Sequence, residues 1–324
     1  MVLALSVSLA MGATAAPEPT ADAVAASDDV QTLLDQGRLA MFGAEPGDAV
    51  HLFFKAAEAG SARALGAIGE LHELGLGMEK SPKDAMVWYR RAASAGDAES
   101  RARLGMMLIN SQAVGSLEEG VELVRKAASQ GNPFGQSAMG QLQLQGLGVP
   151  RDEDAAIRSL VAAAEQEVPA ANRLLGKIYL EGRLVHRDPA MAATLLVEAA
   201  RVGDVEAQTQ LGALYRDGEG VEPDAREAAY WLERAVERGD AEAMSSLGGL
   251  LMHGDEQIKN QDRAIELLRR AAELGQASAQ FQLGQSLIEG EGADKDPEQG
   301  MRWLRTAAAS GFPQATAFME EIRQ

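Results

Sequence analysis

The sequence predicts an all-α protein in which short helices stack as helix–loop–helix repeats into a solenoid. Three observations support this prediction. First, the 324 residues are rich in alanine and glycine, and only 4% are aromatic. Closely packed helices use such small side chains, whereas sheets favour β-branched and aromatic residues. Second, a short motif recurs at a nearly constant interval. Third, the apolar residues between its copies follow the spacing of amphipathic helices.

The first sixteen residues differ from this pattern. The apolar run Val2–Met11 is too short to span a membrane but has the length of a signal-peptide core, and Ala13–Ala15 supplies an A-x-A cleavage pattern. We therefore expect residues 1–16 to be a signal peptide and 17–27 a flexible linker, which makes the protein periplasmic or secreted. Against this, the first basic residue is Arg38, so the usual basic start of a signal peptide is missing and a cytoplasmic location is the alternative.

A small-residue motif marks each repeat. It reads AAEAG at 56–60 and AASAG at 92–96, and the copy AAEQE at 163–167 lacks the final glycine. Its last residue falls at positions 60, 96, 131, 167, 203, 239, 275 and 311, so successive copies lie 35 or 36 residues apart. Self-similarity with a fixed period in this range indicates a repeat architecture.

One repeat, residues 204–239, illustrates the elements that we expect in each. Apolar residues at helical spacing run from Ala207 to Tyr215 and predict a first helix. The glycines and Pro223 of the segment that follows predict a loop. A second apolar stripe, Ala228–Val236, predicts another helix that ends at Gly239. Because one such pair cannot bury its apolar faces alone, neighbouring pairs must stack.

Each first helix also carries a glycine, nine residues after the end of the preceding motif. A glycine inside a helix costs about 1 kcal/mol relative to alanine, so its recurrence needs a reason. We expect the second helix of the repeat to approach the first closely at this point. These glycines are Gly69, Gly105, Gly140, Gly176, Gly212, Gly248 and Gly284.

The consensus of these units resembles the Sel1-like repeat, a relative of the tetratricopeptide repeat. The resemblance rests on Ala207, Leu211, Gly212, Tyr215, Gly218, Gly220, Val221, Asp224, Ala228, Trp231 and Ala235 and on their counterparts in other repeats. It implies a right-handed α/α solenoid superhelix of seven to eight 36-residue helix–loop–helix repeats. In that arrangement residues 28–60 are a degenerate N-terminal repeat, 61–311 are seven repeats and 312–324 are a C-terminal capping helix.

What the resemblance implies about function is general. Sel1-like proteins act mainly as protein-binding scaffolds and adaptors, and a few were proposed to bind or hydrolyse β-lactams. The leading hypothesis is therefore a non-enzymatic protein–protein interaction scaffold of the bacterial cell envelope that binds a partner segment in its concave groove. The alternative is an envelope enzyme or ligand-binding protein that acts on a cell-wall compound, in the manner of a β-lactamase.

Composition and motifs exclude several kinds of catalytic and binding site. The chain has no cysteine, which excludes disulfides, thiolate metal sites and cysteine nucleophiles. Its 48 acidic and 30 basic residues give a net charge of −18, which repels nucleic acid. The four histidines lie at no metal-ligand spacing, and no hydrolase or phosphate-binding motif occurs. We expect no catalytic residue, metal, cofactor, small-molecule ligand or integral membrane span.

The partner-binding surface is expected on the first helices, which line the concave face of tetratricopeptide-like folds. The stripe opposite their core takes positions 3, 6, 10 and 13 after each motif and mixes apolar anchors with polar residues, as peptide-binding grooves do. Its basic members are expected to receive the partner's carboxylates. The alternative is that some stripe residues pack against the adjacent repeat. The predicted residues are Met106, Ile109, Phe134, Gln141, Leu144, Arg173, Lys177, Leu180, Arg216, Phe281, Gln285 and Ile288.

Overall fold

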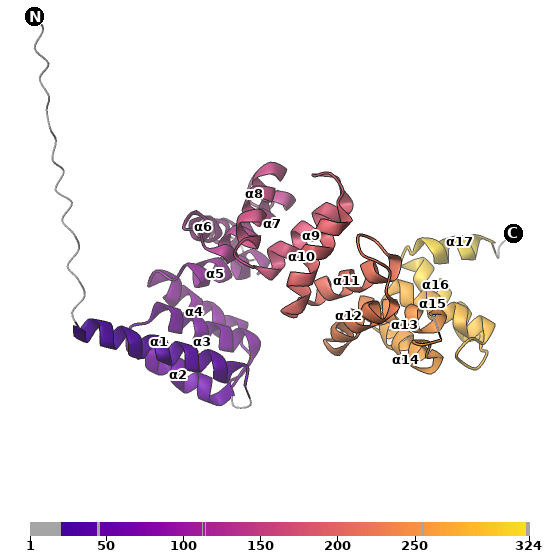
Figure 1. The fold of residues 1–324 in the computed structure, drawn as a ribbon, viewed down its shortest axis with the longest axis horizontal. Helices are drawn as coiled ribbons and strands as arrows, with labels where there is room; N and C mark the ends of the chain where they lie inside the picture. Colours follow the sequence, from indigo (N-terminus) through magenta and orange to yellow (C-terminus); the bar gives the residue numbers. More distant parts are fainter. Residues whose placement is uncertain (1–20, 44–45, 112, 114, 255, 322–324) are drawn as a thin grey trace, which may run out of the picture. The chain divides into compact units, whose positions relative to one another are not determined.

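The computed structural model describes residues 21–43, 46–111, 113, 115–254 and 256–321 (Figure 1). These residues form α-helices joined by turns and loops, and none of them lies in a β-strand. The expected signal peptide, residues 1–16, lies outside the described residues. The helices are α1 (Ala21–Met41), α2 (Pro46–Glu58), α3 (Ala62–Leu74), α4 (Pro82–Ser94), α5 (Ala98–Asn110), α6 (Ser116–Ser129), α7 (Pro133–Gln145), α8 (Glu153–Ala164), α9 (Pro169–Glu181), α10 (Pro189–Arg201), α11 (Val205–Asp217), α12 (Ala225–Glu237), α13 (Ala241–His253), α14 (Gln261–Glu273), α15 (Ala277–Glu289), α16 (Pro297–Ala309) and α17 (Pro313–Glu321).

The chain divides into two compact units, one that extends to Leu104 and one that begins at Gly105. Unit 1 holds α1 to α4 and the start of α5, around a core that includes Phe53, Ile68 and Leu71. Unit 2 holds the remaining helices, which pack as successive pairs from α7–α8 to α15–α16, with α17 against α16. The predicted all-α helix–loop–helix solenoid is confirmed.

The first helix begins earlier than we predicted. Residues 17–27 were expected to form a flexible linker, but α1 starts at Ala21, so 21–27 are helical. The segment ADAVAAS is rich in alanine and contains neither glycine nor proline. Alanine has the highest helix propensity of all residues, and this local preference extends the helix N-terminal to the repeat pattern.

The helices begin and end at the polar and glycine residues that separate the apolar stripes of the sequence. In the repeat 204–239, the Asp204 carboxylate accepts a hydrogen bond from the N–H of Ala207 at 2.9 Å and caps α11. At the other end of α11, Gly218 adopts the left-handed conformation, with φ 68°. The motif copy at 163–167 lacks the final glycine, but its last residue, Glu167, still adopts the left-handed conformation, with φ 59°. A non-glycine residue in this region costs roughly 1–2 kcal/mol.

The glycine in each first helix lies against the second helix of its repeat, as predicted. A Cβ atom at Gly212 would stand 2.6 Å from Cγ of Leu232. The same arrangement recurs at Gly140 with Leu160 and at Gly248 with Leu268, each at 2.7 Å. These distances leave no room for a methyl group, so glycine is required for the helices to pack this closely.

First helices of unit 2 also contact one another from repeat to repeat. Such contacts join α7 to α9, α11 to α13 and α13 to α15. Each of these pairs of first helices therefore shares a surface on which residues of neighbouring repeats meet. This is the surface that carries the predicted stripe.

Substituting Gly212 by alanine should destabilise the fold by about 1–3 kcal/mol, because the buried branch point of Leu232 would have to move. Urea unfolding followed by circular dichroism measures this change. Gly47→Ala is the matched control, since a Cβ there meets nothing within 4 Å and should leave stability unchanged or slightly raised. Equal effects of the two substitutions would contradict the close-packing explanation.

Candidate functional site

A groove of about 560 Å³ lies between the first helices α7 and α9 of unit 2. Its size is within the range of roughly 300–1,000 Å³ that is typical of ligand-binding clefts. We call it the α7–α9 groove. It is lined by Gln141, Leu144, Gln145, Arg151, Glu153, Leu174, Lys177, Ile178, Glu181, Arg183 and Leu184.

The repeat pattern explains why these residues meet. Asn132 caps the start of α7 through the N–H of Gly135 at 2.8 Å, and Gly146 ends the helix in the left-handed conformation. In the next repeat α9 ends in the same way at Gly182. Because both helices end at equivalent points, the loops that follow them place Arg151 and Arg183 at the same groove.

The floor of the groove is apolar and its rim is polar. Leu144, Leu174 and Leu184 are partly buried and pack on a core that contains Leu160, Leu175 and Ile178. On the rim, Arg151 pairs with Glu153 at 2.5 Å and Arg183 pairs with Glu181 at 2.5 Å. An apolar floor with a polar rim is the anatomy of a protein-binding surface.

Three of the predicted stripe residues, Gln141, Leu144 and Lys177, meet in this groove. The predicted stripe missed Leu174, Gln145 and Glu181, which occupy positions 7 and 14 after the motif. These positions lie one helical turn from positions 3 and 10, so extending the stripe by i+4 would have included them.

Among the N-terminal members of the stripe, Ile109 packs against the second helix of its own repeat rather than against the adjacent repeat. Its side chain is buried at 7% exposure and fills the space beside Gly120 of α6. Met106 is partly buried on the same core, whereas Phe134 is 38% exposed. The expectation of an exposed side chain is therefore wrong for Ile109, because glycine in the second helix opens space that isoleucine fills.

The C-terminal members behave similarly. Ile288 contacts the backbone face of Gly300 in α16, as Ile109 does at Gly120. Phe281 contacts Phe312 with the rings tilted and their centroids 5.6 Å apart, and Leu180 packs against the α10–α11 core. Gln285 is partly buried and lines a cavity of about 250 Å³ beside Met252. None of these four lines the α7–α9 groove.

Arg173 is not available to a partner in the way that the sequence suggested. It is 20% exposed and binds the next repeat, through Asp204 at 3.1 Å and Glu206 at 2.7 Å. Asp204 also caps α11, so the arginine links α9 to the start of α11. Its role in repeat stacking corrects the prediction of a free basic residue.

Arg216 is likewise paired, since its guanidinium makes two hydrogen bonds of 2.7 Å to Asp217. That bond raises the pKa of Arg216 and lowers the pKa of Asp217. Of the three predicted basic residues, only Lys177 makes no ion pair with the described residues. Arg216 instead lines a second groove of about 560 Å³ whose other residues are mostly small and uncharged. They are Ser245, Ser246, Gly249, Leu250, His253, Gly254, Ser278, Gln282 and Gln314.

Three polar side chains of this second groove are bonded to one another. The Ser245 and Ser278 hydroxyl oxygens lie 2.8 Å apart, and Nε2 of Gln282 donates to Ser245 at 3.1 Å. Leu250 is its one large aliphatic lining residue and is buried. The groove therefore offers no apolar anchor point comparable to the leucines of the α7–α9 groove.

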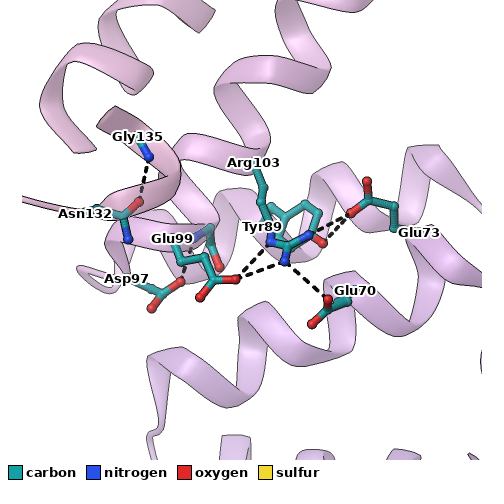
Figure 2. Close-up of polar contacts among 9 residues, drawn as sticks. Glu70, Glu73, Tyr89, Asp97, Glu99, Arg103, Asn132 and Gly135 are labelled. Carbon is teal, nitrogen blue, oxygen red and sulfur yellow. Dashed lines mark hydrogen bonds and ion pairs between the residues drawn. The ribbon is translucent and has the colours of Figure 1, made fainter. Parts of the chain in front are cut away.

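Unit 1 contains a compact charged cluster centred on Arg103 (Figure 2). The guanidinium lies 3.2 Å from Glu70, 3.7 Å from Glu73 and 3.0 Å from Glu99. The Tyr89 hydroxyl donates to Glu73 at 2.6 Å. The cluster ties α5 to α3 and α4, and its carboxylates are occupied by the arginine and the tyrosine.

Burial governs the protonation of this cluster. Desolvation raises the pKa of Glu70 above its usual 4.5, although Arg103 opposes the shift. Burial and the hydrogen bond to Glu73 raise the pKa of Tyr89. Burial opposes the charge of Arg103, but Glu70 and Glu99 outweigh it and raise the arginine's pKa. The arrangement holds Arg103 and Tyr89 protonated and therefore supports a structural rather than an acid–base role.

Among the described residues, no three His, Asp or Glu side chains gather closely enough to hold a metal ion. Within the same part of the chain, no helix combines the length and the apolar character needed to cross a bilayer.

Comparison with known proteins identifies the repeat. The profile described as Sel1 repeat matches residues 45–61, 62–97, 98–132, 133–167, 169–204, 205–240, 241–276 and 277–312. Seven of these matches span a full repeat, and the first covers the region of α2.

Two solved structures are similar over nearly the whole chain. One is c5321, a protective antigen present in uropathogenic Escherichia coli strains that displays an SLR fold, with 29% identity and a TM-score of 0.66. The similarity covers 90% of this chain and 64% of that protein. The other is a Sel1 repeat protein from Oxalobacter formigenes, with 28% identity, a TM-score of 0.56 and coverage of 92% and 88%.

The raised pKa of Glu70 predicts a pH-dependent effect of Glu70→Gln. An acid whose pKa is higher in the folded state opposes folding above that pKa, and the penalty fades as pH falls through it. At pH 7 the variant should therefore be more stable than the wild type, and this difference should shrink towards pH 4.5. Urea unfolding at both pH values measures it.

Glu122→Gln serves as the control, because Glu122 forms an exposed pair with Arg125 and should show little pH-dependent difference. A Glu70→Gln variant that is less stable than the wild type at pH 7 would mean that the pair with Arg103 outweighs the cost of burial.

Proposed function

Because this chain belongs to the Sel1 repeat family, whose members typically are protein-interaction scaffolds, we propose that it is a non-enzymatic scaffold that binds a segment of a partner protein in the α7–α9 groove. The observation that carries the proposal is the apolar floor of that groove. Leu144 on α7, Leu174 on α9 and Leu184 in the loop after α9 remain partly exposed although they adjoin the core. Partly exposed apolar groups within a polar rim supply the anchors that dominate binding energy in protein interfaces.

The location of the groove supports the same function. It is lined mainly by two successive first helices, which contact each other directly, together with residues of the loops that follow them, so repeat stacking fixes most of its shape. A preformed groove on rigid helices binds with little ordering cost. The charged cluster of unit 1 is different in character, since its carboxylates are engaged within the chain.

Photo-crosslinking in the native host tests the proposal. A photoreactive residue in place of Gln145, on the groove rim, should form adducts with a partner protein, whereas the same residue in place of Val202, which is 69% exposed outside the groove, should not. Leu174→Asp should reduce the Gln145 adduct several-fold, because a carboxylate on the floor removes an apolar anchor.

Leu274→Asp is the matched control, at a leucine that is 64% exposed at the end of α14, and should leave the adduct unchanged. Circular dichroism of both variants separates loss of binding from loss of fold. Absence of a Gln145 adduct, or an adduct that a folded Leu174→Asp variant retains, would contradict binding in this groove.

We further propose that the protein acts in the bacterial cell envelope. Support comes from the apolar run Val2–Met11 and the A-x-A pattern Ala13–Ala15 in the sequence. The intact mass of protein recovered from the periplasmic fraction should correspond to a chain without residues 1–16. Accumulation of the uncleaved chain in the cytoplasm would favour the cytoplasmic alternative.

A further inference from the structure

We infer that the α7–α9 groove selects a partner segment in which an apolar side chain lies next to a carboxylate, with Lys177 as the group that binds the acid. This inference rests on the proposed function and specifies the chemistry of its partner. It follows from the charge, the hydrogen-bonding groups and the apolar surface of the groove, taken in turn.

The charges that line the groove do not balance. Arg151 is neutralised by Glu153, and Arg183 by Glu181, which leaves the third cation, Lys177, without an ion pair among the described residues. The Lys177 side chain is exposed and lies on α9 beside the apolar floor. On a chain of net charge −18, such a local positive charge favours a partner carboxylate. An ammonium group accepts a carboxylate without a fixed geometry.

The groove also offers hydrogen bonds that suit a peptide backbone. Gln141 and Gln145 lie one turn apart on α7 and both line the groove. Neither side-chain amide makes a hydrogen bond with the described residues. A glutamine amide carries both donors and acceptors, as a peptide group does. A fatty acid would satisfy Lys177 and the leucines but would leave both amides unused, so the groove favours a peptide.

The floor sets the position of the apolar side chain. Leu174 and Lys177 are three residues apart on α9, so they lie on the same face of the helix. An apolar side chain on Leu174 and Leu144 therefore brings the neighbouring residues of its segment towards the Lys177 ammonium group. Adjacent apolar and acidic residues in the partner would fill both subsites together.

Selection from a displayed library of random twelve-residue peptides on the full chain tests this inference. Peptides that the wild type enriches should carry Asp or Glu next to Leu, Ile or Phe. Lys177→Glu should lose about tenfold in affinity for such a peptide by fluorescence anisotropy, since repulsion replaces attraction. Lys259→Glu makes the same change of net charge at an exposed lysine outside the grooves and should bind as the wild type does.

The outcomes separate this inference from the proposed function. Peptides that bind, depend on Leu174 and show no acidic preference would overturn the role of Lys177 while leaving the scaffold intact. Unchanged affinity of Lys177→Glu would do the same. If no peptide is enriched, both proposals fail. If a fluorescent sixteen-carbon fatty acid binds instead, and Lys177→Glu abolishes that binding, the groove belongs to a lipid and the peptide inference is overturned.

Discussion

The close approach of the two helices within each repeat is the interaction on which the rest of the structure depends. Glycine in the first helix lets a leucine of the second pack directly against its backbone, as at Gly212 and Leu232. The glycine costs helix propensity, but the short separation buries both apolar stripes with small side chains. Because aromatic residues make up only 4% of the chain, the core is filled mainly by small and aliphatic side chains on closely spaced helices.

Several polar side chains of the first helices form hydrogen bonds or ion pairs with an adjacent repeat. Arg173 binds Asp204, and Thr209 donates to Asp240 one repeat later at 3.1 Å. Gln208 donates to the carbonyl of Ala200 at the end of α10, and Gln280 repeats this bond to Ala272. Such side chains satisfy carbonyl groups that helix ends leave unpaired. These side chains hold adjacent repeats together.

Arg103 of unit 1 and Lys177 of unit 2 differ in how their charges are compensated. Arg103 is surrounded by three carboxylates and a tyrosine, so its charge is compensated within unit 1. Lys177 lies in a groove whose carboxylates are bound by two arginines. Both residues are basic and both lie on first helices. They differ in the number of carboxylates of the chain that lie beside them. Only Lys177 lacks an ion pair with the described residues, so its charge is available to a partner.

The sequence alone determined the repeat length, the two helices of each repeat, the glycine at which a second helix ends and the close approach at the helical glycines. These features follow from local helix propensity and from a pattern that recurs in every repeat, so one sequence contains several independent copies of the same signal. Tertiary structure decided which stripe residues remain accessible. Ile109 is buried because Gly120 leaves space beside it, and Arg173 is paired because Asp204 begins the next repeat. Leu174 joins the groove, although its position lay outside the predicted stripe. Whether a stripe residue is accessible depends on side chains in the neighbouring helix or the neighbouring repeat. The apolar periodicity of a single helix does not specify these contacts.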